Sequence, residues 1–154
     1  MGELGWEQKL EDNKQAYAED VVTSSLFVAQ HPLSQSADTY VTVLFASAGV
    51  VPTTVERQDA VNAFGAGGTA GRTAALRKVA DSQTLRAAEF RPAFVLMQYF
   101  GYLRRNPTDP PDSNDSGYQF WLAKLDAFNG DFAKAEMVKA FIISTEYRSR
   151  FGAP

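Results

Sequence analysis

The chain has 154 residues, a formal net charge of −3 and no cysteine, and 45% of its residues are hydrophobic. The apolar fraction is large enough for a core and argues against a disordered chain. The lack of cysteine excludes disulfides and zinc sites built on thiolates. The small acidic charge, without a long basic run, argues against a nucleic-acid binder. No stretch reaches the ~18 apolar residues of a membrane span, and the first residues lack the pattern of a signal peptide.

Turn and capping signals divide the first half of the chain into amphipathic helices. The first covers residues 6–28 and ends before Pro32, and its large apolar side chains recur in steps of four and seven: Trp6, Leu10, Tyr17, Val21 and Val28. A second helix follows the capping residue Ser36. Thr53-x-x-Glu56 has the pattern of a capping box, in which side chain and backbone satisfy each other's free N–H groups, and it predicts a third helix.

Four further helices are expected in the second half. One covers residues 72–86, and another begins at Pro92, a residue that suits the first turn of a helix. Ser116-x-x-Gln119 is a second capping-box pattern, and apolar side chains accompany it at helical spacing: Tyr118, Trp121, Leu122, Leu125 and Phe128. Asp131 is expected to cap the last helix. The sequence therefore predicts an all-α fold, a multi-helix bundle of about seven helices.

An internal repeat is indicated by one pattern that closes three helices: Ser24-Ser25-Leu26-Phe27, Ser82-Gln83-Thr84-Leu85 and Ser144-Thr145-Glu146-Tyr147. The serines are roughly 60 residues apart, and repeats of this size usually build structural arrays. We therefore expect two pseudo-repeated helical units, a diverged one over residues 36–90 and a second over residues 91–154, within one compact domain. Residues 1–35 would form a lead-in helix that resembles the closing helix of a preceding unit. The chain would then be the carboxyl-terminal piece of a larger protein.

The second unit resembles a known family. The resemblance rests on the segments AFVLMQYFGYLRRNP (93–107), GYQFWLAKL (117–125), AEMVKAFI (135–142), EYR (146–148) and RFG (150–152). Together they resemble a bacterial domain-of-unknown-function family, number 4214, whose members typically lie at the carboxyl ends of large secreted or surface proteins. The resemblance implies an all-α fold and an extracellular or cell-surface setting as part of a larger exported protein. It implies no activity and supplies no catalytic residues.

The glycine-rich segment 65–73 has a spacing close to that of phosphate-binding loops, in which backbone N–H groups converge on phosphate at a helix start. Arg72 stands where a P-loop requires Lys, and the segment follows a predicted helix rather than a strand. We therefore interpret it as a flexible connector and expect no bound nucleotide or other cofactor.

A second candidate site is the loop that begins at Asp109. It offers carboxylate and amide oxygens at a spacing similar to that of a calcium loop, and the candidate metal ligands are Asp109, Asp112, Asn114 and Asp115. The twelfth position is Ala123 rather than the bidentate Glu that such a loop requires. Turn formation and helix capping are the preferred interpretation, and calcium binding is the alternative.

Three aromatic residues close to this loop in sequence, Tyr99, Tyr118 and Trp121, are a candidate platform for a glycan, although aromatic residues at helical spacing more often belong to a core. His31 is the only histidine and falls in a predicted connector. No pair of carboxylates stands out for glycoside chemistry.

The residues therefore indicate a protein without catalytic residues. We expect a non-enzymatic structural or interaction module that binds a protein partner or associates with itself. The alternative is a ligand-binding module for calcium or a glycan, built from the loop at 109–117 and the neighbouring aromatic side chains.

Overall fold

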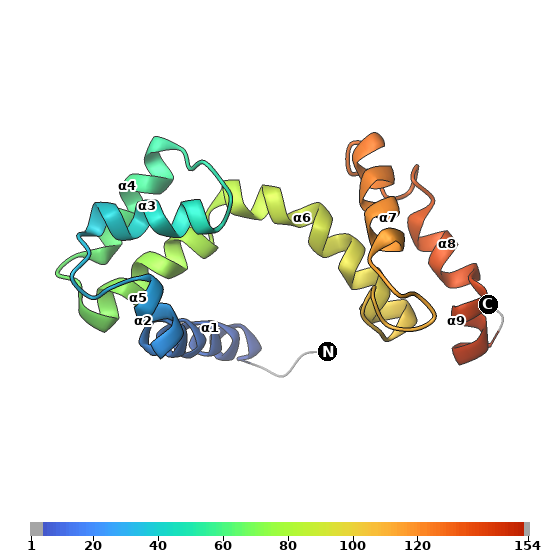
Figure 1. Ribbon diagram of the computed structural model, residues 1–154, viewed down its shortest axis with the longest axis horizontal. Coiled ribbons are helices and arrows are strands. Elements are labelled where there is room, and N and C mark those ends of the chain that lie inside the picture. Colours follow the sequence, from blue (N-terminus) through green and yellow to red (C-terminus); the bar gives the residue numbers. More distant parts are fainter. Residues whose placement is uncertain (1–4, 153–154) are drawn as a thin grey trace. The chain divides into compact units, whose positions relative to one another are not determined.

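The computed structural model describes residues 5–152, and every regular element in this range is a helix. Nine α-helices and one π-helical turn follow one another (Figure 1): α1 (Trp6–Thr23), α2 (Ser25–Gln30), α3 (Ala37–Ser47), α4 (Thr54–Phe64), α5 (Gly68–Ala80), α6 (Gln83–Gln98), η1 (Tyr99–Leu103), α7 (Ser116–Ala127), α8 (Met137–Ile143) and α9 (Thr145–Phe151). The predicted all-α fold is confirmed. Within the described range, no helix has the length and apolar character needed to cross a membrane.

The helices form two compact units, residues 1–86 (unit 1) and residues 87–154 (unit 2), and α6 runs across the division. This division lies close to residue 90, where the sequence predicts the end of the first helical unit. The helix predicted as a lead-in element packs within unit 1, where α1 lies against α5.

The described range contains two more α-helices than the predicted seven, because serines break the first and the last predicted helix. Ser24 separates α1 from α2, and Ser144 separates α8 from α9. Both serines have extended backbone angles, with ψ of 143° and 148°. Ser82 also lies between two helices, α5 and α6, with Asp81 before it.

The three junctions share their hydrogen bonds, and we call each of them a serine corner. The serine N–H donates to the carbonyl three residues earlier in the chain, that of Val21, Val79 or Phe141. The serine hydroxyl accepts the N–H three residues later, from Phe27, Leu85 and Tyr147, at 3.3, 3.3 and 3.1 Å. Each serine therefore ends one helix and caps the next.

The start of α6 differs from the prediction. The helix begins at Gln83 and continues through Pro92, which the sequence analysis placed in a first helical turn. The serine corner explains the difference, because the Ser82 hydroxyl already accepts the Leu85 N–H and starts the helix two turns earlier. Proline then costs the helix interior one backbone hydrogen bond.

The capping box predicted at Ser116 is wrong. Ser116 is the first residue of α7, and Asp115 occupies the N-cap position. The Ser116 N–H donates to Asn114 Oδ1 at 2.9 Å, and Gln119 Nε2 donates to Asp115 Oδ2 at 3.0 Å. Asn114 thus supplies the acceptor that the prediction assigned to the Gln119 side chain, and the Gln119 N–H donates to the backbone carbonyl of Asp115.

The last predicted helix begins later than expected. Asp131 Oδ1 accepts the Lys134 N–H at 3.0 Å, but this bond closes a turn instead of a helix. Glu136 then adopts a left-handed φ of 51°, and α8 begins at Met137. Asp131 therefore accepts a capping hydrogen bond, but it caps the turns before α8 rather than the helix itself.

Each unit has its own hydrophobic core. The core of unit 1 comes from α3, α4 and α5 and contains Tyr40, Val41, Leu44, Phe45, Ala60, Phe64, Ala75 and Val79. The core of unit 2 comes from α6, η1, the turns before α8, α7 and α8 and contains Val95, Tyr99, Leu103, Leu125, Ala135, Met137 and Phe141. In both units the residue three positions before a serine corner, Val79 or Phe141, is part of the core.

The glycine-rich segment forms a short turn followed by a close helix contact. The connector predicted over residues 65–73 shrinks to residues 65–67, because α5 already starts at Gly68. Gly67 takes the N-cap position with a φ of 79°. A Cβ on Gly71 would overlap the Phe64 carbonyl oxygen. Glycine at this position therefore allows α4 and α5 to approach each other more closely than any larger residue would.

Candidate functional site

The four candidate calcium ligands each have a partner in the protein. Asp109 Oδ2 accepts the N–H of Asn106 at 2.8 Å, and Asp112 Oδ2 pairs with Nη2 of Arg105 at 2.7 Å. Asn114 and Asp115 bind the first turn of α7, as described above. Within residues 5–152, no three acidic or histidine side chains lie close enough to hold a metal ion.

The loop after η1 is organised by Arg105, whose side chain is largely buried. Its Nε donates to Glu146 at 2.7 Å, and its Nη2 donates both to Glu146 at 3.0 Å and to Asp112 at 2.7 Å. Its Nη1 donates to three backbone carbonyls of the loop, those of Asn106, Pro107 and Asp109. The hydrogen bonds to Glu146 raise the pKa of Arg105 above its ordinary value. One permanently charged side chain thus attaches the loop to the start of α9.

The three residues of the candidate aromatic platform lie in the packing of unit 2. Tyr99 is buried, and Tyr118 and Trp121 are half-buried against the same core. Tyr99 and Trp121 contact Phe141 with ring centroids 5.1 and 5.5 Å away, and the Tyr118 hydroxyl donates to the carbonyl of Pro92 at 3.3 Å. Tyr99 and Trp121 therefore pack on Phe141, and all three residues pack against the core of unit 2.

Arg72, the residue that matched a phosphate-binding lysine in sequence, points into unit 1. Its side chain is buried, and its Nη2 donates to the backbone carbonyl of His31 at 2.5 Å. Its guanidinium lies 4.2 Å from the centre of the Tyr40 ring. The side chain is therefore used to hold the segment after α2, and His31 itself is buried beside it.

Glu56 links the starts of two helices. The predicted capping box with Thr53 is confirmed, since Glu56 Oε2 accepts the Thr53 N–H at 2.8 Å and the Thr53 hydroxyl accepts the Glu56 N–H. The same carboxylate accepts the N–H and the hydroxyl of Thr84, at 2.8 and 2.6 Å. The hydrogen bonds from Thr84 and Thr53 lower the pKa of Glu56 to about 2. Glu56 thus joins the N-terminus of α4 to that of α6.

Replacing Glu56 by Gln is expected to lower the melting temperature of unit 1 by a few degrees at neutral pH. The wild-type contribution is present above the ordinary glutamate pKa of 4.5 and is lost as the pH falls from there toward about 2. The variant should lack this acid-dependent loss. Thermal unfolding followed at several pH values tests both expectations, with the exposed Glu19→Gln as control. Equal pH profiles for wild type and Glu56→Gln would show that the carboxylate contributes nothing.

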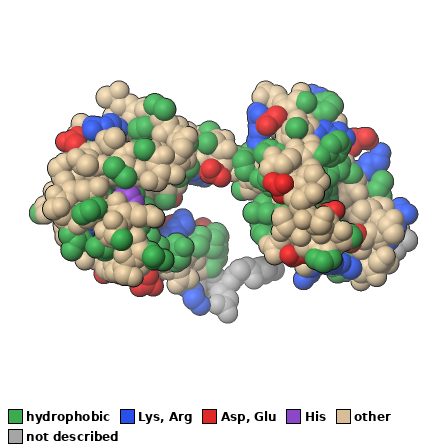
Figure 2. All heavy atoms as spheres, in the orientation of Figure 1, with side chains coloured by type: hydrophobic (Ala, Val, Ile, Leu, Met, Phe, Trp, Pro, Cys, Tyr) green, Lys and Arg blue, Asp and Glu red, His purple; other side chains and the backbone are tan. Residues whose placement is uncertain are grey.

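One apolar surface of unit 1 lies on α1. The α1 face consists of the exposed Trp6, Leu10 and Tyr17 and the partly exposed Val21, and Tyr17 is 72% exposed. The other side of α1 carries the buried Ala18 and Val22 and is joined to α5 by the ion pair between Glu11 and Arg77, at 2.5 Å. Hydrophobic side chains reach the visible surface of both units (Figure 2).

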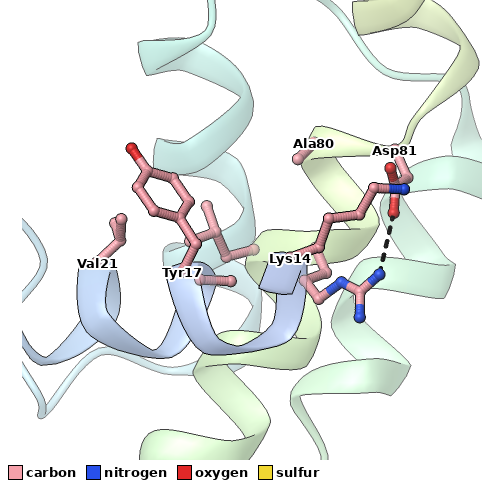
Figure 3. Close-up of a pocket in the computed structure, with 8 residues that line it drawn as sticks. Lys14, Tyr17, Val21, Ala80 and Asp81 are labelled. Atoms are coloured by element: carbon pink, nitrogen blue, oxygen red, sulfur yellow. Dashed lines mark ion pairs between the residues drawn. The ribbon is translucent and has the colours of Figure 1, made fainter. Parts of the chain in front are cut away.

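Part of the α1 face borders a groove between α1 and α5. The groove has a volume of about 410 Å³ and is lined mainly by carbon atoms of Tyr17, Ala18, Val21, Leu76 and Ala80, with Lys14, Arg77 and Asp81 at its edge. Figure 3 shows Tyr17 and Val21 standing on α1, across from Ala80 and Asp81 at the end of α5, where Asp81 pairs with Arg77 at 3.9 Å. An apolar wall with charged ends suits a helix carrying apolar side chains better than a small polar ligand.

Sequence patterns did not predict that Arg72 and Arg105 are buried, or that Glu56 also binds Thr84 at the start of α6. Arg72 lies ten residues before its serine corner, in the same helical stripe as Ala75 and Val79, which are buried. An arginine in a stripe that otherwise faces the core is a usable signal for a buried guanidinium. Arg105 carries no such signal, because it lies in a loop.

Comparisons of the chain with protein-family models, with curated proteins and with solved structures find no match.

Proposed function

We propose that the chain is a non-enzymatic interaction module, the carboxyl-terminal helical part of a larger secreted or cell-surface bacterial protein of the kind gathered in family 4214. The resemblance of residues 93–152 supports the family and the setting. The all-α fold agrees with the fold that this resemblance implies. In this proposal the α1 face is the surface that contacts the rest of the protein.

The observation that carries the proposal is a comparison of the three serine corners. Three and seven residues before its corner, α5 has Val79 and Ala75, and α8 has Phe141 and Met137, and all four side chains are buried. At the same two positions α1 has Val21, which is partly exposed, and Tyr17, which is largely exposed. At these two positions α5 and α8 are therefore covered by other helices, whereas α1 is not.

The two covered corners indicate what would occupy the α1 face. In unit 1 the cover of α5 comes from the preceding pair α3 and α4, and in unit 2 the cover of α8 comes from η1 with the end of α6 and from α7. We therefore propose two pseudo-repeated units, and before residue 1 a further helix pair of this kind. Its apolar side would pack on Tyr17 and Val21.

The residue two positions after each serine also supports a preceding helix pair as the cover of the α1 face. Thr84 is bound by Glu56 from the first turn of α4, and Glu146 is bound by Arg105 from the loop between η1 and α7. In both cases a residue of the covering pair reaches the corner. The corresponding residue of the first corner, Leu26, is exposed. Leaving a large apolar side chain in water costs roughly 1.5–3 kcal/mol relative to burial, so several such positions together favour a cover.

The test uses a single cysteine introduced into a chain that has none. Tyr17→Cys should react rapidly with a thiol reagent in residues 1–154. It should react at least tenfold more slowly in the complete reading frame, because the preceding helix pair would bury it. Labelling rates followed by mass spectrometry give the ratio directly.

Val55→Cys is the matched control, since Val55 is exposed on α4 and should react equally in both proteins. Equal rates at position 17 with and without the upstream sequence would contradict the proposal. A reading frame with no coding sequence before residue 1 would contradict it as well.

A further inference from the structure

The only histidine of the chain is buried in unit 1. His31 follows α2, is 3% exposed, and stacks on Phe27 of that helix with ring centroids 4.3 Å apart. Tyr40 of α3 meets the imidazole edge-on at 5.7 Å. The buried Nδ1 atom has no hydrogen-bond partner among the residues that the structure describes. The proton that Nδ1 would carry in the charged imidazole therefore has no acceptor in this environment.

A permanent positive charge already lies beside the imidazole. Arg72 of α5 is 2% exposed and donates to the carbonyls of His31 and Pro32, at 2.5 and 3.3 Å. Across residues 5–152, no carboxylate forms an ion pair with Arg72 or with His31. The guanidinium is stabilised by the two carbonyl dipoles and by the face of the Tyr40 ring.

The titratable and charged groups around His31 are therefore Tyr40 from α3 and Arg72 from α5, while α2 contributes the uncharged Phe27. Burial raises the pKa of Tyr40 to about 12, so this hydroxyl stays neutral and supplies no anion. Burial, and secondarily the charge of Arg72, lower the pKa of His31 below its ordinary 6.5. A second buried cation without a partner is strongly unfavourable.

We propose that the His31–Arg72 contact is an acid-sensitive latch, which holds the α2 end of unit 1 closed while the imidazole is neutral and releases it when the imidazole is protonated. Release separates the carbonyls of His31 and Pro32 from Arg72 and lets water reach both cations. Unit 2 contains no histidine, so the latch acts on unit 1 alone. The proposal does not depend on the function proposed above.

The direction of the pH effect follows from linkage. A histidine whose pKa is lowered by folding binds its proton more readily in the open form. Its contribution to the stability of unit 1 is therefore complete above pH 6.5 and decreases as the pH falls below that value. Between the pKa of the open form and that of the closed form, each unit by which the pH falls raises the opening equilibrium constant by up to about tenfold.

The experiment is an NMR titration of the intact chain, in which a single histidine gives an unambiguous imidazole signal. The pKa of His31 should lie below 6.5 in the folded protein and return to that value in urea. Between neutral pH and about one unit below the ordinary histidine pKa, amide signals of α2, α3 and α5 should lose protection, while those of α7 and α8 should keep theirs.

His31→Phe preserves the stacked ring and removes the titration, so the acid-dependent loss in unit 1 should disappear in this variant. Glu56→Gln is the control, because the carboxylate of Glu56 titrates only below pH 4.5 and should leave the response near pH 6 unchanged. A folded-state imidazole pKa at or above 6.5 would overturn the latch, and so would an unchanged acid response in His31→Phe. If that variant does not fold, the titration of the wild-type imidazole decides alone.

Discussion

Replacing Gly71 by Ala should destabilise unit 1 by about 3 kcal/mol, the upper end of the range for overpacking a well-packed site. The added methyl group would overlap the carbonyl oxygen of Phe64. Because this atom belongs to the backbone of α4, it cannot rotate away as a side chain could, and the two helices must separate. The loss should exceed the ~1 kcal/mol of helix propensity that Ala gains over Gly. Equilibrium unfolding in urea, followed by amide signals of unit 1, measures the difference.

Gly101→Ala is the matched control. Gly101 lies in a helical turn of unit 2, and a Cβ there would meet nothing within 4 Å. This substitution should therefore be neutral or stabilise unit 2 by up to about 1 kcal/mol. If Gly71→Ala behaved like Gly101→Ala, the close approach of α4 and α5 would not be a determinant of the fold.

Arg105→Met should destabilise unit 2 by about 3 kcal/mol, the lower end of the range for removing one partner of a buried ion pair. The variant leaves Glu146 without its main partner and leaves the carbonyls of the 106–109 loop without their common donor. The lower end is expected because Asp112 can turn to water and Arg150 still reaches Glu146 at 3.2 Å. Urea unfolding resolved by amide signals of α7, α8 and α9 gives the value.

Arg91→Met tests whether any arginine–carboxylate pair in unit 2 would give the same result. Arg91 pairs with Asp126 at 2.8 Å, but both side chains are substantially exposed. Exposed pairs contribute about 1 kcal/mol or less. Losses of similar size in the two variants would mean that burial of the Arg105 guanidinium adds nothing, contrary to the structure.

The features that could be predicted from sequence depend on neighbouring residues. The capping box at Thr53 and Glu56 is made within one helical turn, and the structure contains it. The serine motifs were recognised as a common closing pattern for the same reason. The break at each serine was missed because apolar side chains continue at helical spacing on both sides of Ser24 and Ser144, so periodicity alone predicts one uninterrupted helix.

The remaining features depend on residues that are distant in the chain. Arg105 acquires its role only when Glu146, forty-one positions later, is brought beside it. The glycine-rich segment was interpreted as a flexible connector because composition does not show which glycine faces another backbone. In the same way, the candidate calcium ligands were grouped by spacing, whereas the structure directs Asp112 to Arg105 and Asp109 to a backbone N–H.

The serine corner also bears on how such a chain could have grown. All of its shared hydrogen bonds join residues within one turn on either side of the serine, so the joint is encoded by a short stretch of sequence. For the pseudo-repeated units proposed above, copying the DNA for one helix pair together with its corner would therefore insert a unit whose connection to its neighbours is already encoded. Selection would then have to adjust only the apolar side chains at the new contact. Lineages with different numbers of units can arise in this way by unequal recombination, while each joint stays unchanged.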